Sequence, residues 1–328
     1  MKNNNNKFYR FAGFLDDNEQ GGKQQPTDNT TMANPIVSTL PQYVDENRFE
    51  LIGKSVFGGR TASIINYNTG VKGTATLNIL ETEVALQDGA TCGFTAQGTQ
   101  EITQRPLVTY PYKVNMEYCE KNFLNTFAQY LVKVNAVDNA LPYEEKFIAD
   151  VINSVNNKIE KMLWVGESGE NAKDSFGFLT IAESEDNSIK IDGSKSDVFG
   201  ALQKTLLALP TSAIAEDTRF FVGDDTFMKL VTELVNKNLY HYNAEHLNYE
   251  LVLPGTNIRV TAVNGLNGTN KIVAGKASNF YMGVDMEGDQ ERFDFWFSKD
   301  DRTFKLAIEF NLGTQIAFPD EVVVTTLA

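Results

Sequence analysis

The feature that most constrains the fold is an alternating run near the end of the chain, TFKLAIEFNLGTQIAF at 303–318. A period of two is typical of a β-strand with one buried face, because successive side chains point to opposite sides of a sheet. At about 3.3 Å per residue the run would reach roughly 50 Å, whereas ordinary strands span about 17 to 20 Å. The register that we expect to be buried consists of Phe304, Leu306, Ile308, Phe310, Leu312, Thr314, Ile316 and Phe318.

The other residues of this strand are expected to face solvent or a neighbouring subunit. They are Lys305, Glu309, Asn311 and Gln315. Gly313 marks an expected bend, since glycine inside a strand pattern often accompanies one. The strand is therefore predicted to be one half of an elongated two-layer structure.

Composition excludes several classes of protein. A chain of 328 residues with 42% hydrophobic content is globular and long enough for one large or two ordinary domains. Its formal net charge of -14 opposes direct DNA recognition. Cys92 and Cys119 cannot form a disulfide framework, and neither lies in a CxxC pair. No apolar run is long enough for a membrane helix, and no secretion signal is recognised.

The first part of the chain is expected to be a flexible segment, 1–34, because residues 16–34 contain almost nothing apolar. Its one apolar cluster, FYRFAGFL at 8–15, is either a frayed tail or a short docking peptide, and we prefer the tail because chain ends are commonly poorly ordered. Residues 35–65 show no clear helical or strand period. They are predicted to form an extended N-terminal arm lying on other structure.

Residues 66–106 predict a long two-stranded excursion, rich in Thr, Gly and Gln and with turn signals at GVKG and QDGATCG. Such a hairpin buries little by itself, so another surface should cover it. The following run, LVTYPYKVNMEY, predicts a half-buried strand, and Pro111 places it at an edge or at a bulge. A short amphipathic helix is predicted over 120–134.

A longer helix is predicted over 144–165, ended by Gly166. Its apolar stripe is too wide and too short for a coiled coil, so we expect it to pack on a sheet. Glu160 is placed on the opposite, polar side. The stripe consists of Ile148, Ile152, Val155, Ile159 and Met162, widened by Phe147, Val151 and Leu163.

Residues 190–298 predict a compact mixed domain inserted between the long helix and the long strand. One helix should begin after Ser196 or Asp197 and stop at Pro210, and another should be capped by Asp224 or Asp225. Short strands with Gly and Asn turns complete the domain. They are TRFFVG, YELVLPG, NIRVTAV, NKIVAG, NFYMGVDM and RFDFWF.

No residue pattern in the chain predicts a catalytic, cofactor or metal site. His241 and His246 are five positions apart, which turns them away from each other on a helix. The pair Asp224 and Asp225 stands where a helix needs a cap. GTNKIVAGK does not fit a phosphate loop, and Ser168 lies in no GxSxG elbow. Cys119 is expected to be a small buried residue rather than a nucleophile.

The order of these elements resembles that of the major capsid protein of tailed bacteriophages, which has the Hong Kong 97-type fold. The resemblance runs from about Asn34 to the end of the chain. It rests also on the local texture of TRFFVGDDTFMKL, LPGTNIRVTAVNGL and EFNLGTQIAFPDEVVV. It implies an α+β fold with an N-terminal arm, an extended loop, a peripheral domain with a long spine helix on long strands, and an axial domain.

Laid over this sequence, the resemblance assigns each segment a place. The N-terminal arm is 35–65, the hairpin 66–106 is the extended loop that lies across a neighbouring subunit, and 144–165 is the spine helix. The peripheral domain comprises 107–189 and 299–319. The axial domain comprises 190–298 and 320–328, so that EVVVTT returns to it.

The resemblance also implies the partners. Copies of the chain would form pentamers and hexamers in a shell that encloses DNA without sequence-specific binding and without a membrane. Because 1–34 is too short and too polar for a built-in scaffold, a separate scaffolding protein and a portal are expected. No isopeptide crosslink is expected: Lys72 and Glu309 could serve as donor and acid, but 298–310 contains no asparagine acceptor.

The leading functional hypothesis is therefore a non-enzymatic major capsid protein. It would form the icosahedral head of a tailed double-stranded DNA bacteriophage, be assembled in the host bacterial cytoplasm and reside in the virion. An encapsulin-like compartment shell is the nearest alternative. An enzyme or ligand-binding protein with its site in 190–298, using His241 and Asp224, is the alternative from another class.

Overall fold

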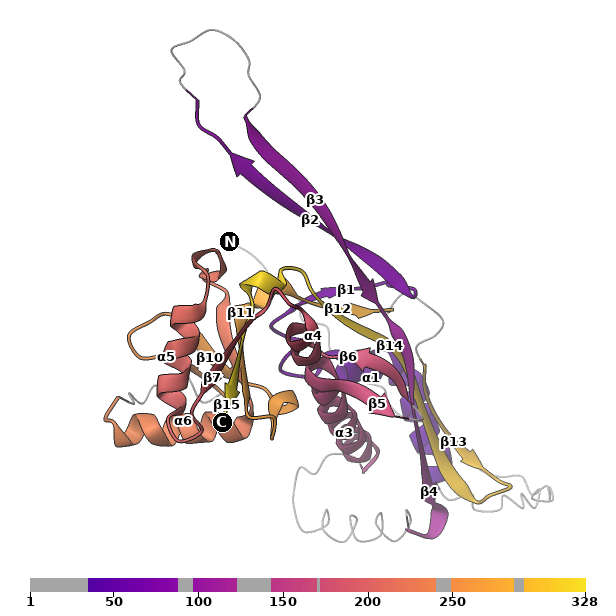
Figure 1. Cartoon of the computed structure of the whole chain (residues 1–328). Helices are drawn as coiled ribbons and strands as arrows, with labels where there is room; N and C mark the ends of the chain where they lie inside the picture. The colour runs from indigo at the N-terminus through magenta and orange to yellow at the C-terminus, as the bar shows by residue number, and fades with distance from the viewer. Residues whose placement is uncertain (1–34, 88–96, 123–142, 170–171, 240–248, 286–291) are drawn as a thin grey trace, which may run out of the picture.

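The computed structural model describes residues 35–87, 97–122, 143–169, 172–239, 249–285 and 292–328. Figure 1 shows two sheet-based units side by side and a long hairpin that projects away from them. We name the two large sheets the long sheet and the compact sheet. The N-terminal segment and the predicted helix at 120–134, beyond its first turn, lie outside the described residues, as do His241 and His246.

The long sheet has five strands and is organised around β14 (Thr303–Ile316). The antiparallel strands β12 and β13 follow one another along one edge of β14, and β4 pairs antiparallel along its other edge. Strand β1 adds to β12 in parallel. The bounds are β1 Asn66–Asn68, β4 Tyr110–Cys119, β12 Phe280–Val284 and β13 Arg292–Ser298.

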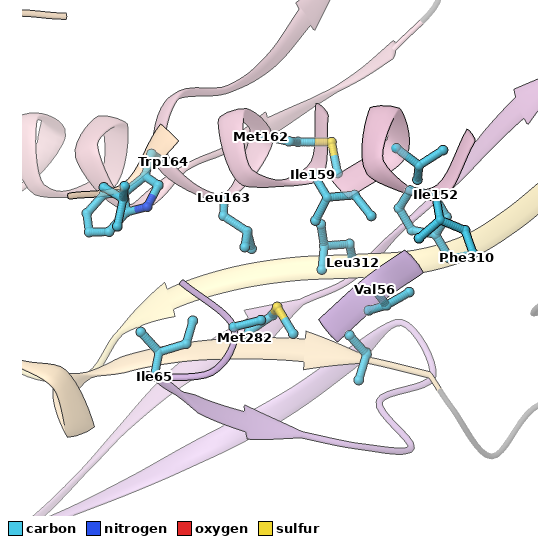
Figure 2. Packing of buried hydrophobic residues seen from close by; sticks show 14 of the residues in the cluster. Val56, Ile65, Ile152, Ile159, Met162, Leu163, Trp164, Met282, Phe310 and Leu312 are labelled. Atoms are coloured by element: carbon cyan, nitrogen blue, oxygen red, sulfur yellow. The ribbon is translucent and has the colours of Figure 1, made fainter. Parts of the chain in front are cut away.

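The alternation in β14 positions the core. Its even-numbered side chains from Phe304 to Leu312 are at most 4% exposed and join the apolar stripe of α3 (Tyr143–Val165) in one cluster. Figure 2 shows Ile159 and Met162 of α3 facing Leu312 of β14. The predicted helix on a long strand is thus confirmed, and α3 ends as expected at Gly166, whose φ of 85° favours glycine.

The burial along this run differs from the prediction at three side chains. Thr314 and Phe318 were expected to be buried and are only partly buried. Asn311 was expected to face outward and is only 7% exposed. Pairing continues through Gly313, which lies opposite Gly283 of β12. A Cβ at Gly313 would lie 2.0 Å from the carbonyl oxygen of Val108, so the glycine serves the close approach of the chain that leads from the hairpin into β4. Pro111 lies on β4, whose one described pairing is with β14, so its predicted edge position is confirmed.

The N-terminal arm is helical, which corrects the prediction of an extended segment. Helix α1 (Pro35–Phe57) packs against α3 and β13. Its buried residues do repeat with helical spacing, but Asn47 and Arg48 interrupt them in the middle. Arg48 is used there to pair with Asp294 of β13, with 2.5 Å between Nη2 and Oδ1. The buried residues are Leu40, Val44, Leu51, Ile52 and Val56.

The compact sheet has six strands in the order β7-β15-β11-β8-β10-β9. One face is covered by α5 (Val198–Ala208) and α6 (Asp224–Asn236), and the other contributes Phe221, Val273 and Val324 to the same core as α3. The strands are β7 Ile189–Gly193, β8 Thr218–Val222, β9 Glu250–Val252, β10 Arg259–Ala262, β11 Lys271–Lys276 and β15 Val323–Leu327.

Most of the predicted elements of this unit are confirmed. Asp197 caps α5 by accepting a hydrogen bond from the N–H of Gly200 at 3.1 Å, and the final strand β15 returns to the compact sheet between β7 and β11. The boundary at 298 differs, however. Strands β12 and β13, which the sequence placed in the inserted domain, pair with β14 in the long sheet.

Smaller elements complete the described chain, in which no helix is long and apolar enough to cross a membrane. They include α4 (Phe178–Ser184), which packs beside α3, and the two-stranded sheet of β5 (Gly166–Gly169) and β6 (Ala172–Phe176). Short 3-10 helices are Thr211–Ala213 (η1), Asn264–Leu266 (η3), Ala277–Asn279 (η4) and Pro319–Glu321 (η5). The hairpin is formed by β2 (Thr74–Val84) and β3 (Gly98–Val108).

Candidate assembly surfaces

The projecting hairpin is a two-stranded sheet on its own. Its register runs without interruption from Thr74 opposite Val108 to Val84 opposite Gly98. At about 3.4 Å per residue, strands of this length extend about 34 Å. Among the described strands, β2 and β3 pair only with each other, so no strand covers either outer edge of the hairpin. Figure 1 shows the outer part of this ribbon standing clear of both large sheets, while the lower end of β3 runs beside β14.

The base of the hairpin is anchored to the body. Val71, Leu77 and Leu107 form a small buried cluster against Tyr281. The hydroxyl of Thr109 donates to the carbonyl of Val71 at 3.0 Å. In addition, Gln315 Nε2 of β14 donates to the carbonyl oxygen of Pro106 at 2.8 Å, and Arg105 forms an ion pair with Glu185, the residue that follows α4. These contacts fix the direction in which the hairpin leaves the body.

Beyond its base the hairpin exposes large apolar side chains. Leu80 and Ile102 lie directly opposite each other in the register and are 56% and 66% exposed. Val84, the last residue of β2, and Leu86, two residues after it, are also exposed. An isolated two-stranded hairpin with an open apolar ladder is marginal in water. This face therefore has the composition of a contact surface.

A buried carboxylate fixes α3 to the segment that follows α1. Glu160 of α3, which was predicted to lie on the polar side of its helix, is 3% exposed. It accepts hydrogen bonds from the backbone N–H and the hydroxyl of Thr61, at 2.7 and 2.6 Å. Thr61 in turn accepts a bond from Trp164 Nε1 at 2.8 Å. Burial raises the pKa of Glu160 above its ordinary value, although the Thr61 hydrogen bonds oppose this.

The same junction explains Asp224. The N-cap of α6 is Gly223, which makes no side-chain cap bond, so the predicted capping by Asp224 or Asp225 is wrong. Instead, Asp224 Oδ1 pairs with Arg60 Nη1 at 2.7 Å, and its backbone N–H donates to Asn267 Oδ1 at 2.6 Å. The side chain of Asn267 therefore accepts the hydrogen bond that an N-cap residue would normally accept. Asp224 instead links α6 to Arg60, in the segment after α1.

Other sequence candidates form no catalytic group. Cys119 is exposed at the end of β4, contrary to the expectation that it is buried. Ser168 lies in β5 and Lys276 in strand β11, where it pairs with Glu321. The described residues contain no cluster of His, Cys, Asp or Glu that could hold a metal ion. A pocket of about 320 Å³ lies where the hairpin meets α4 and β14, and its one carboxylate, Glu185, is paired with Arg105.

No family model and no curated protein matches the sequence. Solved structures do match over most of the chain. The satellite phage P4 procapsid including its size determination protein gives a TM-score of 0.60 at 10% identity, covering 84% of this chain and 89% of that chain. The chain has the Hong Kong 97-type capsid fold.

Two further solved structures are similar to this chain. A protein of Gordonia phage Cozz has a TM-score of 0.57 at 11% identity and covers 82% of this chain and 86% of that chain. The virus-like particle from Pyrococcus furiosus has a TM-score of 0.51 at 14% identity, and the match covers 87% of this chain and 99% of that chain. The Hong Kong 97-type fold agrees with the α+β class expected from the sequence. In this chain the hairpin projects from the body that α3 and the two large sheets form.

Proposed function

We propose that the chain is a major capsid protein that self-assembles into the icosahedral head of a tailed double-stranded DNA bacteriophage. The observation that carries the proposal is the projecting β2–β3 hairpin. It has edges that no described strand covers and an exposed Leu80–Ile102 ladder, on a body with the Hong Kong 97-type fold. A neighbouring copy would bury the surface that the hairpin cannot bury on its own subunit.

Under this proposal the segments have distinct roles. The body of α3 on the long sheet is the peripheral domain with its spine helix, and the compact sheet is the axial domain that gathers into pentamers and hexamers. The acidic balance of 43 Asp and Glu against 29 Lys and Arg fits a wall to which packed DNA does not adhere. The protein would be assembled in the cytoplasm of a bacterial host with a separate scaffolding protein and a portal, and would reside in the virion without a catalytic role.

The test is the assembly state of the full chain. The protein is expressed alone and together with a candidate scaffolding protein, then examined by sizing and electron microscopy. Closed, regular shells are the expected result. A persistent monomer whose stability depends on a small ligand would contradict the proposal and favour the enzyme or binding-protein alternative. The Arg60–Asp224 pair already gives Asp224 a structural use, and His241 lies outside the described residues.

An encapsulin-like compartment is the second candidate. The protein of the Pyrococcus furiosus virus-like particle is matched by this chain over 99% of its length. The contents of purified particles distinguish the two functions. Nuclease-protected double-stranded DNA within particles from infected or induced cells supports a phage head. A specific enclosed protein without DNA supports a compartment.

A covalent crosslink between subunits is not expected in these particles. Lys72 is exposed before the hairpin, and Glu309 lies on β14 opposite Lys113 of β4, while 298–310 offers no asparagine. Particles boiled in detergent should therefore release bands of monomer size on a denaturing gel. Ladders of covalent multimers under reducing conditions would contradict this prediction.

A further inference from the structure

The root of the hairpin borders a pocket of about 320 Å³, which we call the root pocket. Its walls come from the end of β3, the start of β4, the helices α3 and α4, and the last part of β14. Most of its apolar lining is formed by Val108, Tyr110, Tyr112, Met162, Ile181 and Leu312. Pockets that bind small molecules commonly have volumes of roughly 300 Å³ and more, so the root pocket is large enough for such a ligand.

The floor of the root pocket is apolar. Met162, Ile181 and Leu312 are each at most 8% exposed and belong to the core that α3 and β14 share. Figure 2 shows Met162 and Leu312 on these two facing elements. The ring of Tyr112 packs against Phe310 at a centroid distance of 6.0 Å. An apolar cavity of roughly 150 Å³ holds one benzene molecule, so a pocket about twice that size suits two fused aromatic rings.

The charges of the root pocket indicate a neutral ligand. Glu185 is the one charged side chain among the described residues that line it, and it is paired with Arg105. An anionic ligand would be repelled by Glu185, and a cationic ligand would have to displace Arg105 from it. Ser184 and Gln315 already donate hydrogen bonds to backbone carbonyl oxygens, at 2.9 and 2.8 Å. The binding energy would therefore come mainly from apolar and aromatic contact.

The root pocket also lies across a joint of the molecule. Val108 is the last residue of the hairpin strand β3, while Ile181 belongs to α4 of the body. A ligand in contact with both would tie the root of the hairpin to the body. It would favour the hairpin direction seen in Figure 1, because a ligand shifts an equilibrium toward the state that it binds better. With free ligand at about 100 times its Kd, that state would gain about a hundredfold.

We propose that the root pocket binds a small neutral aromatic molecule of about two rings, and that the bound molecule fixes the direction of the hairpin. The binding does not depend on the capsid function. Its consequence for assembly rests on the proposed function, because the hairpin is then the element that reaches a neighbouring subunit.

Binding of Prodan, a neutral naphthalene dye, to the full-length chain tests the proposal. We expect saturable binding of one dye molecule per chain, with the emission shifted to shorter wavelength by the apolar site. Anilinonaphthalene sulfonate, which carries a negative charge, should not displace it. Ser184→Trp places an indole at the exposed rim of the pocket and should weaken the affinity by about tenfold or more. Asp186→Trp, an equally exposed position outside the lining, is the control and should bind as the wild type does.

Hydrogen exchange of the wild-type chain locates the bound dye without any substitution. Saturation with Prodan should slow amide exchange in 104–112, at the root of the hairpin, and in 178–185, which contains α4. Exchange in β8 of the compact sheet should not change. An absence of saturable binding, equal weakening in both tryptophan variants, or protection confined to other segments would overturn the proposed site.

Particle assays separate this inference from the function on which its consequence rests. Regular particles formed by a chain that does not bind Prodan would overturn the root pocket as a ligand site and leave the capsid function standing. Dye binding by a chain that never forms particles would support the ligand site and contradict the shell. Particles that expel one dye molecule per chain as they close would show that a neighbouring chain fills the pocket, and this result would overturn the small-molecule occupant.

Discussion

At the scale of single residues, Glu160 and Trp164 fix α3 to its surroundings. Glu160 connects α3 to Thr61 after α1, and Thr61 connects to Trp164. Trp164 packs against Phe221 of the compact sheet at a ring-centroid distance of 4.9 Å and against Phe280 of the long sheet at 6.0 Å. Trp164 thus forms a packed joint between the two large sheets.

The dependence of folding stability on pH should reveal the raised pKa of the Glu160 carboxyl. The pKa of Glu160 is raised in the folded state because the group is buried, so its protonated form favours folding. Its contribution is fully present below the unfolded pKa and is lost as the pH rises through the raised folded pKa. Relative to Glu160→Gln, the wild-type free energy of unfolding should therefore fall as the pH increases from about 4 upward. Chemical denaturation at several pH values measures the difference, and a difference that rises with pH would refute this assignment.

Gly265 is a second residue on which the joint depends. A Cβ there would lie 2.2 Å from the carbonyl oxygen of Glu160 and 2.5 Å from Trp164 Cδ1. Gly265→Ala should therefore lower the free energy of unfolding by about 2 kcal/mol or more, because backbone must move. Gly53→Ala is the matched control, since a Cβ at this position in α1 meets nothing within 4 Å. The control should be neutral or stabilising by about 0.5 to 1 kcal/mol in thermal or chemical denaturation.

At the scale of elements, β14 and α3 are two long elements of the body, and each buries its apolar stripe on the other. Ile308 is 1% exposed in the middle of this contact. Ile308→Asp should cost about 4 kcal/mol or more, since it places an unpaired charge in the core, and should abolish folding. Lys305→Gln, on the opposite side of the same strand, should leave the subunit folded with little change in stability.

Far-ultraviolet circular dichroism and solubility of the two variants measure this difference. Lys305 forms an ion pair with Asp301 near the surface, which explains the small cost expected of its loss. A soluble, folded Ile308→Asp protein would show that the even-numbered face of β14 is not the one that holds α3.

The sequence predicted those elements whose own periodicity was strong. The stripe of α3 and the alternation of β14 were readable because each uses one regular pattern, and the hairpin was readable from its turn signals and polar composition. Helix α1 was missed because Asn47 and Arg48 stand within its buried face, and Arg48 is retained there by Asp294, which is distant in sequence. Glu160 and the Asn267 acceptor for α6 were missed for the same reason. Their hydrogen-bond partners come from other elements, so no local sequence pattern predicts these contacts.

At the scale of the whole molecule, the hairpin should matter for assembly and little for folding. Leu80→Thr combined with Ile102→Thr removes the apolar ladder while keeping residues that favour strands. Because both positions are more than half exposed, the subunit should keep its thermal unfolding midpoint. Assembly into particles should be lost or strongly reduced, as sedimentation measures.

The control for this experiment changes the other face of the hairpin. Thr99→Ser combined with Glu101→Gln alters two exposed residues beside the ladder without touching it. Particles of this control should form as in the wild type. Equal loss of assembly in both variants would mean that the ladder has no specific role.

The most direct test of the central claim is an image reconstruction of assembled particles. The account predicts that β2 and β3 lie across an adjacent subunit, with Leu80 and Ile102 buried in that contact and the body of α3 on β14 unchanged. A closed shell in which the hairpin folds onto its own subunit, or leaves Leu80 and Ile102 exposed to solvent, would contradict it.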